Sequence, residues 1–254
     1  MTEFDPGPPP EIAEIFARVP DYSPFKEHFW YDWGPVFYRG RLDGSARILC
    51  VASDPGPTER VAARTLVGDA GQRVQGFLAK IGLLRSYLCL NAFAYALHPG
   101  SFWEGLDILR DEDQLAWRNE LFDSVNGPEL RAVIAFGLQA QVAVGLWEGK
   151  GSLPVFEVPH PSSRKPEELL EAWRNAVTRL RETVPADPDG EPVAPNYGNV
   201  FREEDHARIP FRDLPFGVPR GRLLGRGATP RHNNSVDRPS PDDGHTLIWI
   251  APRS

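Results

Sequence analysis

The sequence predicts a three-layer α/β/α sandwich around a central, mainly parallel sheet of four strands. Three observations support this fold class. Between residues 47 and 184, short runs of apolar and β-branched residues alternate with longer segments of helical periodicity. The short runs are apolar throughout, which is typical of strands covered by helices on both faces. Each run ends in a glycine-containing or polar turn, as expected where a buried strand leads into a helical crossover.

Each element follows from its local pattern. Strands are expected at 47–52, 86–90, 130–136 and 154–158. Helices are expected at 10–19, 71–81, 111–125, 138–146 and 167–184. The segment 71–81 shows the basis, because its apolar residues recur at helical spacing: Val74, Phe77, Leu78 and Ile81.

One α/β domain is predicted over residues 1–184, with an aromatic- and Pro-rich N-terminal part, 1–45, packed on it. Residues 185–254 form a Pro- and Arg-rich extension, for which we expect an ordered wrap over the domain; a flexible tail is the alternative. The run 247–251 reads as a strand. A positive patch within the extension, hypothesised to extend a track for DNA, comprises Arg220, Arg222, Arg226 and Arg231.

Composition excludes several classes of protein. With 254 residues, 41% of them hydrophobic, the chain has material for one sizeable core, and no apolar run is long enough to span a membrane. No secretory signal is visible at the N-terminus, so we expect a cytoplasmic protein. The net charge of −7 argues against uniform coating of DNA but leaves room for a local basic groove. Cys50 and Cys89 lie in apolar runs and outside any CxxC pair, so buried free thiols are expected.

Polar groups stand at the ends of the predicted strands. They are Asp54 with Pro55 and Gly56, Asn91, Gly137, and His160 with Ser162, Ser163 and Arg164. Ligands of open parallel sheets bind outside the carboxyl ends of the strands, so these groups should converge. Taken singly, Asp54 fits an ordinary turn, Asn91 a cap and His160 a structural histidine. Their combination on several loops favours a functional site.

These segments resemble the motifs of the uracil-DNA glycosylase superfamily. Residues 51–59 read VASDPGPTE, residues 66–72 read LVGDAGQ, Asn91 follows a strand, and residues 160–164 read HPSSR. The resemblance covers about residues 45–182. The order and spacing of the motifs are fairly specific to the superfamily, although each motif is short.

The resemblance implies a role for each matched residue. Asp54 matches the aspartate that positions the attacking water, and His160 matches the histidine that stabilises charge on uracil O2. Asn91 matches the amide that reads the uracil edge, while Ser53, Gly56 and Leu66 fall among the substrate-binding positions. The loop that grips DNA corresponds to Ser162, Ser163, Arg164 and Lys165.

The chain also departs from the family pattern. Gly56 stands where one branch has a tyrosine that excludes thymine, and Leu66 stands where another branch has a phenylalanine that stacks on uracil. The iron–sulfur cysteines of that second branch are missing. The segment 66–71 matches no nucleotide-binding spacing, so no nucleotide cofactor is expected. The strand-end residues include no metal-ligand cluster, so we expect neither a metal nor another cofactor.

We therefore expect a monomeric, monofunctional glycosylase that flips uracil out of single- or double-stranded DNA and releases it as product. A catalytically weak homologue that binds damaged or abasic DNA is one alternative. A glycosylase for another base is a second. A hydrolase of small esters or phosphates is a third, disfavoured because the chain lacks a GxSxG nucleophile elbow.

Overall fold

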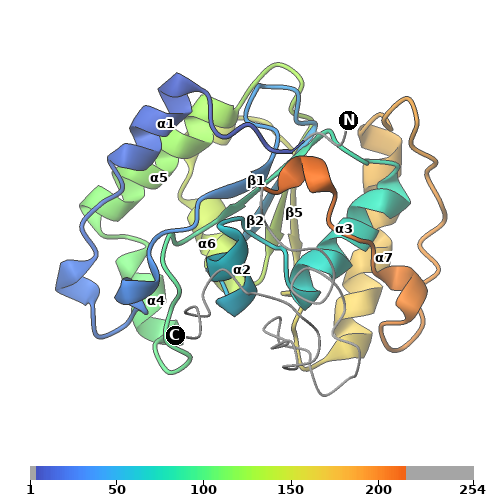
Figure 1. Ribbon diagram of the computed structural model, residues 1–254. Helices are drawn as coiled ribbons and strands as arrows, with labels where there is room; N and C mark the ends of the chain where they lie inside the picture. The colour runs from blue at the N-terminus through green and yellow to red at the C-terminus, as the bar shows by residue number, and fades with distance from the viewer. Residues whose placement is uncertain (1–3, 216–254) are drawn as a thin grey trace, which may run out of the picture.

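The computed structural model describes residues 4–215 and has an α/β/α architecture around a mixed, mostly parallel sheet (Figure 1). The sheet has five strands in the order β1-β3-β2-β4-β5. The strands are β1 (Tyr38–Gly40), β2 (Ile48–Ala52), β3 (Tyr87–Asn91), β4 (Ala132–Phe136) and β5 (Val155–Val158). The predicted fold class is thereby confirmed.

Helices cover both faces of the sheet. They are α1 (Pro10–Ala17), α2 (Pro57–Ala62), α3 (Asp69–Ile81), α4 (Phe102–Ile108), α5 (Glu112–Val125), α6 (Leu138–Gly145) and α7 (Pro166–Thr183). Residues of α1, α5 and α6 share one apolar core with one face of the sheet, and residues of α3 and α7 share a second core with the other face. No helix in residues 4–215 combines the length and the apolar character needed to cross a bilayer.

The predicted count of four strands is wrong, because β1 adds a fifth. It pairs antiparallel with β3 at the edge of the sheet. A three-residue strand is too short for a periodic pattern to reveal it. Its last residue, Gly40, has a φ of +106°, and a Cβ there would lie 2.3 Å from the carbonyl oxygen of Tyr87. Helices α2 and α4, which follow β2 and β3, were also not predicted, since each is only six or seven residues long.

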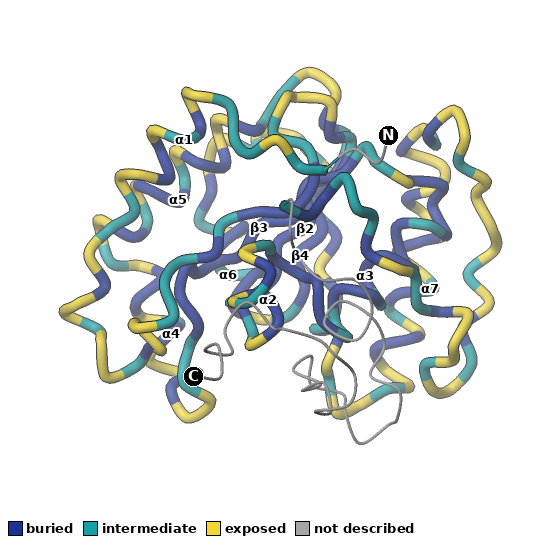
Figure 2. The backbone as a smooth tube through the Cα atoms, in the orientation of Figure 1, coloured by how far each residue is buried: buried dark blue, intermediate teal, exposed yellow. Residues whose placement is uncertain are grey.

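The central strand β2 pairs in parallel with β3 and with β4. All five of its residues are buried, and Figure 2 shows the middle of the sheet as the most buried part of the backbone. Cys50 and Cys89 are register partners on β2 and β3, and both are buried free thiols as the sequence predicts.

The C-terminal segment 185–215 crosses the helix α3 side of the domain and reaches the edge strand (Figure 1). Asp187 accepts hydrogen bonds from the backbone N–H groups of Leu84 and Arg85 at 2.7 and 2.8 Å. Further along, the Ala207 N–H donates to the carbonyl of Gln72 at 3.0 Å. The segment is therefore attached at several points. The predicted strand at 247–251 and the Arg patch at 220–231 lie outside the described residues.

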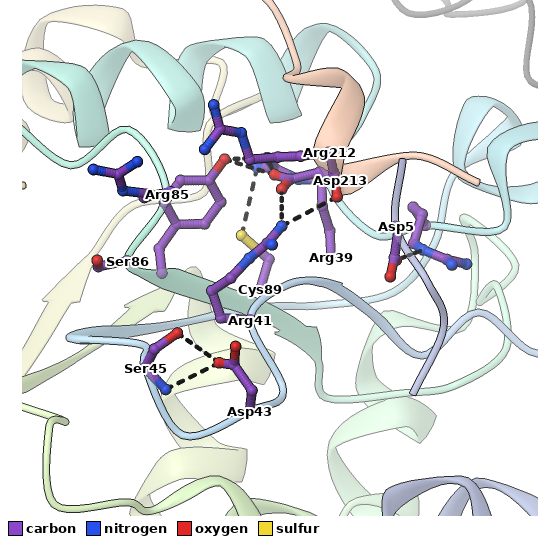
Figure 3. A network of polar contacts seen from close by, with 12 residues as sticks. Asp5, Arg39, Arg41, Asp43, Ser45, Arg85, Ser86, Cys89, Arg212 and Asp213 are labelled. Carbon is purple, nitrogen blue, oxygen red and sulfur yellow. Dashed lines mark hydrogen bonds and ion pairs between the residues drawn. The ribbon is translucent and has the colours of Figure 1, made fainter. Parts of the chain in front are cut away.

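Asp213 anchors the end of this segment through a buried polar cluster (Figure 3). Its carboxylate accepts from Arg39 at 3.0 Å, from Arg41 at 2.6 Å and from the hydroxyl of Tyr87 at 2.6 Å. The Arg39 side chain is fully buried, so the carboxylate is the charge that compensates its guanidinium. One residue later, the Leu214 carbonyl accepts from the N–H of Asp5, which joins the two ends of the described chain.

We predict that Asp213→Ala strongly destabilises the protein. The change leaves the buried Arg39 guanidinium without its anion, and breaking such a pair costs about 3–5 kcal/mol. Asp189→Ala is the matched control, because it removes an Asp–Arg pair of the same segment whose side chains are largely exposed. That variant should change the free energy of unfolding by at most about 1 kcal/mol. Urea denaturation measures both; equal shifts of the two midpoints would contradict the prediction.

Candidate active site

The loops that follow β2, β3, β4 and β5 meet at the carboxyl edge of the sheet and enclose two adjoining cavities. The first, called here the Leu66 cavity, has a volume of about 520 Å³ and is lined by residues that include Gly56, Glu59, Leu66 and Arg73. The second, the Phe102 cavity, has a volume of about 640 Å³ and is lined by residues that include Ser53, His98, Phe102 and Gln139. Both volumes are typical of small-molecule sites.

Asp54, His160 and Ser162 line both cavities and so form their shared wall. The first residue follows β2, and the other two follow β5, on the far side of β4. The structure thus brings together the carboxyl and the imidazole that the sequence suggested as a pair.

Asp54 is held in a defined orientation. Its Oδ2 accepts a hydrogen bond from the N–H of Leu97 at 2.9 Å, in the loop that follows β3. Burial of the carboxyl group raises the pKa of Asp54 to about 6, against a smaller opposing effect of the hydrogen bonds from Leu97 and Ser53. Asp54 is therefore a carboxylate at neutral pH, with a proton affinity suited to general base chemistry.

His160 is held as a neutral ring with a defined tautomer. The backbone N–H of Ser162 donates to its Nδ1 at 3.1 Å, so this nitrogen carries no hydrogen. In the neutral ring the hydrogen is then on Nε2, which becomes a donor. Burial lowers the pKa of His160 to about 4, and the positive charge of Arg73 acts in the same direction. Gly137, with a φ of +86°, leaves room for the ring, since a Cβ there would lie 3.0 Å from the Cβ of His160.

Glu59 ties two loops of the Leu66 cavity together. Its Oε1 accepts from the N–H groups of Val67 and Gly68 at 2.8 and 2.9 Å, and its Oε2 accepts from the N–H of Gly56 at 3.1 Å. The carboxylate is buried and sits on the first turn of α2. It thereby fixes the loop that carries Leu66 relative to the loop that carries Asp54.

Leu66 forms an apolar part of its cavity and is itself in a strained conformation, with a φ of 50°. The close approach of helix α3 contributes to this geometry. A Cβ on Gly71 would lie 1.7 Å from the carbonyl oxygen of Leu66, so the helix can pass here only with a glycine. This close contact explains why position 71 is a glycine.

Asn91 ends β3 and is 7% exposed, and it is not among the residues that line either cavity. Its register partner Ala52, whose side chain points to the same face of the sheet, does line the Leu66 cavity. Within residues 4–215, neither the Oδ1 nor the Nδ2 of Asn91 has a hydrogen-bond partner. The donor and the acceptor of this amide are therefore both available to a group that reaches it.

The loop after β5 divides into a part at the cavities and a part outside them. Ser162, Ser163 and Arg164 line the Leu66 cavity. Lys165 does not; its ammonium group is exposed and pairs with Glu168 at 2.9 Å. Ser53, predicted with the substrate-binding group, lines only the Phe102 cavity, where its hydroxyl donates to Oε1 of Gln139.

Two residues that sequence reasoning missed support these loops. Arg73 donates from Nη1 to the carbonyl of Pro161 at 2.7 Å and pairs with Asp69 at 2.7 Å. Gln139 contacts Ser53 and also donates to the carbonyl of Phe102 at 3.1 Å. Only the i,i+4 spacing of Asp69 and Arg73 could have drawn attention to the arginine, whereas the role of Gln139 depends on tertiary contacts.

The described residues 4–215 hold no group of three or more His, Cys, Asp or Glu side chains placed to bind a metal ion.

We predict that Glu59→Gln loosens the walls of the Leu66 cavity. The amide lacks the charge of the carboxylate and presents a donor where an N–H must be accepted, so the free energy of unfolding should fall by about 1–3 kcal/mol. Amide exchange at Gly56, Val67 and Gly68 should accelerate accordingly. Glu129→Gln, at an exposed ion pair, is the control. Unchanged exchange over residues 56–68 would show that the carboxylate does not hold these loops.

No protein-family model matches this chain, and no curated protein shows significant similarity to it. A functional assignment therefore depends on the residues at the carboxyl edge of the sheet.

Proposed function

We propose that this protein excises uracil from DNA by hydrolysing the N-glycosidic bond of deoxyuridine, leaving an abasic site. The observation that supports the proposal best is the shared wall of the two cavities, where a carboxyl with a pKa of about 6 and a neutral imidazole face the same space. The target nucleotide must leave the base stack to reach such a site, at a cost of a few kcal/mol.

His160 serves as the hydrogen-bond donor to the departing base. As the bond between C1′ and N1 breaks, the electron pair passes to the base and negative charge develops on uracil O2. The Nε2–H of His160 stabilises this charge without transferring a proton, which suits a ring whose pKa of about 4 keeps it neutral. One such donor, already oriented, is worth about 2.7–4 kcal/mol in the transition state.

Asp54 acts at the sugar. Its carboxylate stabilises the oxocarbenium-like deoxyribose and accepts the proton of the water that attacks C1′, so that the hydroxyl remains on the sugar. The hydrogen bond from Leu97 occupies Oδ2 and fixes the direction of the group. The proton taken up by Asp54 then passes through solvent to the uracil anion, so the reaction balances as a hydrolysis that yields uracil and an abasic site.

We assign recognition of the base to Leu66, which lines the cavity, and to Asn91, which lies beside the lining residue Ala52 and must become accessible as the base enters. The unpaired donor and acceptor of the Asn91 carboxamide complement O4 and N3–H of uracil, whereas cytosine presents the inverse pattern. Leu66 offers an aliphatic surface to the ring. Gly56 places no side chain in the cavity wall next to Asp54, so a pyrimidine with a 5-methyl group is the second substrate class to test.

We predict that the purified protein, with EDTA present, releases uracil from uracil-containing oligonucleotides. Asp54→Asn and His160→Ala should each lower the rate by at least about 100-fold, because each removes a group that acts in the transition state. Asp113→Asn is the control, since this carboxylate is exposed on α5. Alkaline strand cleavage reports the abasic product.

Substrates with thymine mismatches, hypoxanthine or an abasic site complete the assay. Cleavage of thymine mismatches alone would reassign the base specificity. Retention of DNA without cleavage would instead support a binding protein for damaged DNA. Near-normal uracil release by both variants would place the chemistry elsewhere.

We also predict an acidic limb in the pH–rate profile. Asp54 has a raised pKa of about 6, so the carboxyl is protonated and inactive as a base below that pH and ionised above it. The excision rate should fall about tenfold per pH unit well below pH 6 and reach a plateau above it. Asp54→Asn should lose this limb. Single-turnover rates between pH 4.5 and 8 measure the effect, and a profile that is flat through pH 5 contradicts the assignment.

A further inference from the structure

We propose that a set of exposed and partly exposed aromatic rings beside the Phe102 cavity binds the unpaired bases of single-stranded DNA that flank the excised nucleotide. The set, called here the aromatic rim, comprises the exposed Trp30, Phe102 and Trp103 and the partly exposed Trp33 and His98. The inference rests on the proposed function, because the identity of the polymer comes from the chemistry assigned to Asp54 and His160. It adds a preference for single strands over duplex.

The rim exposes more aromatic surface than folding of the domain requires. Trp103 is 70% exposed, Trp30 is 44% exposed and Phe102 is 38% exposed. Single apolar residues on a surface are ordinary, but a group of large rings beside a polar cavity marks a site of interaction.

The rings form a connected series that reaches the candidate active site. Trp33 and Trp30 stack with centroids 5.4 Å apart and an interplanar angle of 16°. Trp30 in turn meets the ring of His98 at 4.4 Å. His98 and Phe102 line the Phe102 cavity, and Asp54 and His160 line it as well. A strand with one base in the active site would therefore run past these rings.

Both parts of the rim are fixed to the body of the protein. The N–H of Trp30 donates to the carbonyl of Ala96, and the N–H of His98 donates to the carbonyl of His28, each at 2.8 Å. On the other side, α4 lies so close to α6 that a Cβ on Gly105 would approach Nε2 of Gln139 to 2.9 Å. The rings are thus presented without a large loss of conformational freedom on binding.

Unpaired bases fit this surface better than the other candidates do. A ring can stack on a base only when the face of that base is free, and a duplex hides these faces. Asp32 and Glu104 are next to ring residues in the chain, and their exposed carboxylates repel the phosphates of DNA. Stacking of bases on the rings must therefore supply much of the binding energy. Arg60, whose guanidinium lies 5.2 Å from the Trp33 ring centroid, provides a cation at the far end. A protein docked on the rim would instead obstruct the Phe102 cavity.

The test measures binding of the full-length chain to uracil-free oligonucleotides, so it does not depend on excision. Fluorescence anisotropy gives affinities for a labelled mixed-sequence single strand and for the matching duplex. Trp103→Ala and Phe102→Ala should each weaken single-strand binding by about 5- to 100-fold, the effect expected of one lost base–ring stack. Binding to the duplex should change less than twofold, and Trp103→Phe should retain most of the single-strand affinity.

Leu84→Ala is the matched control. Leu84 is 37% exposed, but it lies before β3, at the end of that strand opposite the cavities, so its loss should change neither affinity. Circular dichroism confirms that each variant is folded. Since stacking is not ionic, the ratio of wild-type to Trp103→Ala affinity should stay constant when salt is raised, although both affinities fall.

The outcomes separate the two proposals. The rim proposal is overturned if both ring variants bind the single strand with wild-type affinity. It is also overturned if they lose affinity for single strand and duplex equally, or if the wild-type chain does not bind the single strand. If the ring variants lose affinity as expected but the wild-type chain releases no uracil, the rim stands and the proposed function fails. If uracil is released and the ring variants bind normally, the function stands and the rim fails.

Discussion

Strand β2 pairs in parallel with β3 on one side and β4 on the other, in registers that align Ala52 with Asn91 and Val51 with Ala135. Because parallel strands point the same way, the loops that leave β2, β3 and β4 start at one edge of the sheet. β5 extends the arrangement by one strand and adds His160. The convergence of Asp54, Asn91 and His160 is thus a consequence of strand direction, and buried apolar residues of β2 enforce it.

Strand direction alone does not fix the side chains to within hydrogen-bonding distance, and buried polar contacts supply that precision. The buried carboxylate of Glu59 is stabilised by three backbone N–H donors and not by a cation. It therefore links two loops without placing a positive charge beside Asp54. Arg73 holds the loop of His160 through the carbonyl of Pro161, and its charge adds to the effect of burial, which lowers the pKa of the imidazole. The same enclosure raises the pKa of Asp54 and lowers that of His160, because a buried site disfavours the charged form of either group.

The sequence predicted the features that depend on local pattern. The α/β/α class and the main strands and helices followed from apolar runs and helical spacing, and the shared wall of Asp54 and His160 followed from strand ends. Features set by tertiary contact were not predictable. No local sequence pattern shows that β1 is an edge strand or that Asp213 pairs with the buried Arg39. Nor does any local pattern show that Glu59 accepts three backbone hydrogen bonds. Lys165 belonged to a plausible motif, yet its exposed ammonium group pairs with Glu168 outside the cavities.

Aromatic rings are scarce inside the Leu66 cavity and abundant at the aromatic rim, and this difference affects how much stacking energy each place can supply. Among the described residues that line the Leu66 cavity, His160 has the only aromatic ring, and the apolar lining is aliphatic: Ala52, Pro57, Leu66 and Ala70. An aliphatic floor gains dispersion contact with a base but lacks the π-face of an aromatic ring, so less stacking energy is available inside the cavity to offset extrusion of the base from a duplex. In a single strand the extrusion cost is smaller, because no base pair breaks. The aromatic surface lies instead at the rim, where Phe102 and Trp103 would meet the neighbouring bases of the proposed substrate. Little stacking energy inside the cavity and more at the rim both favour the same proposed substrate, a single strand whose bases are already free to stack on protein.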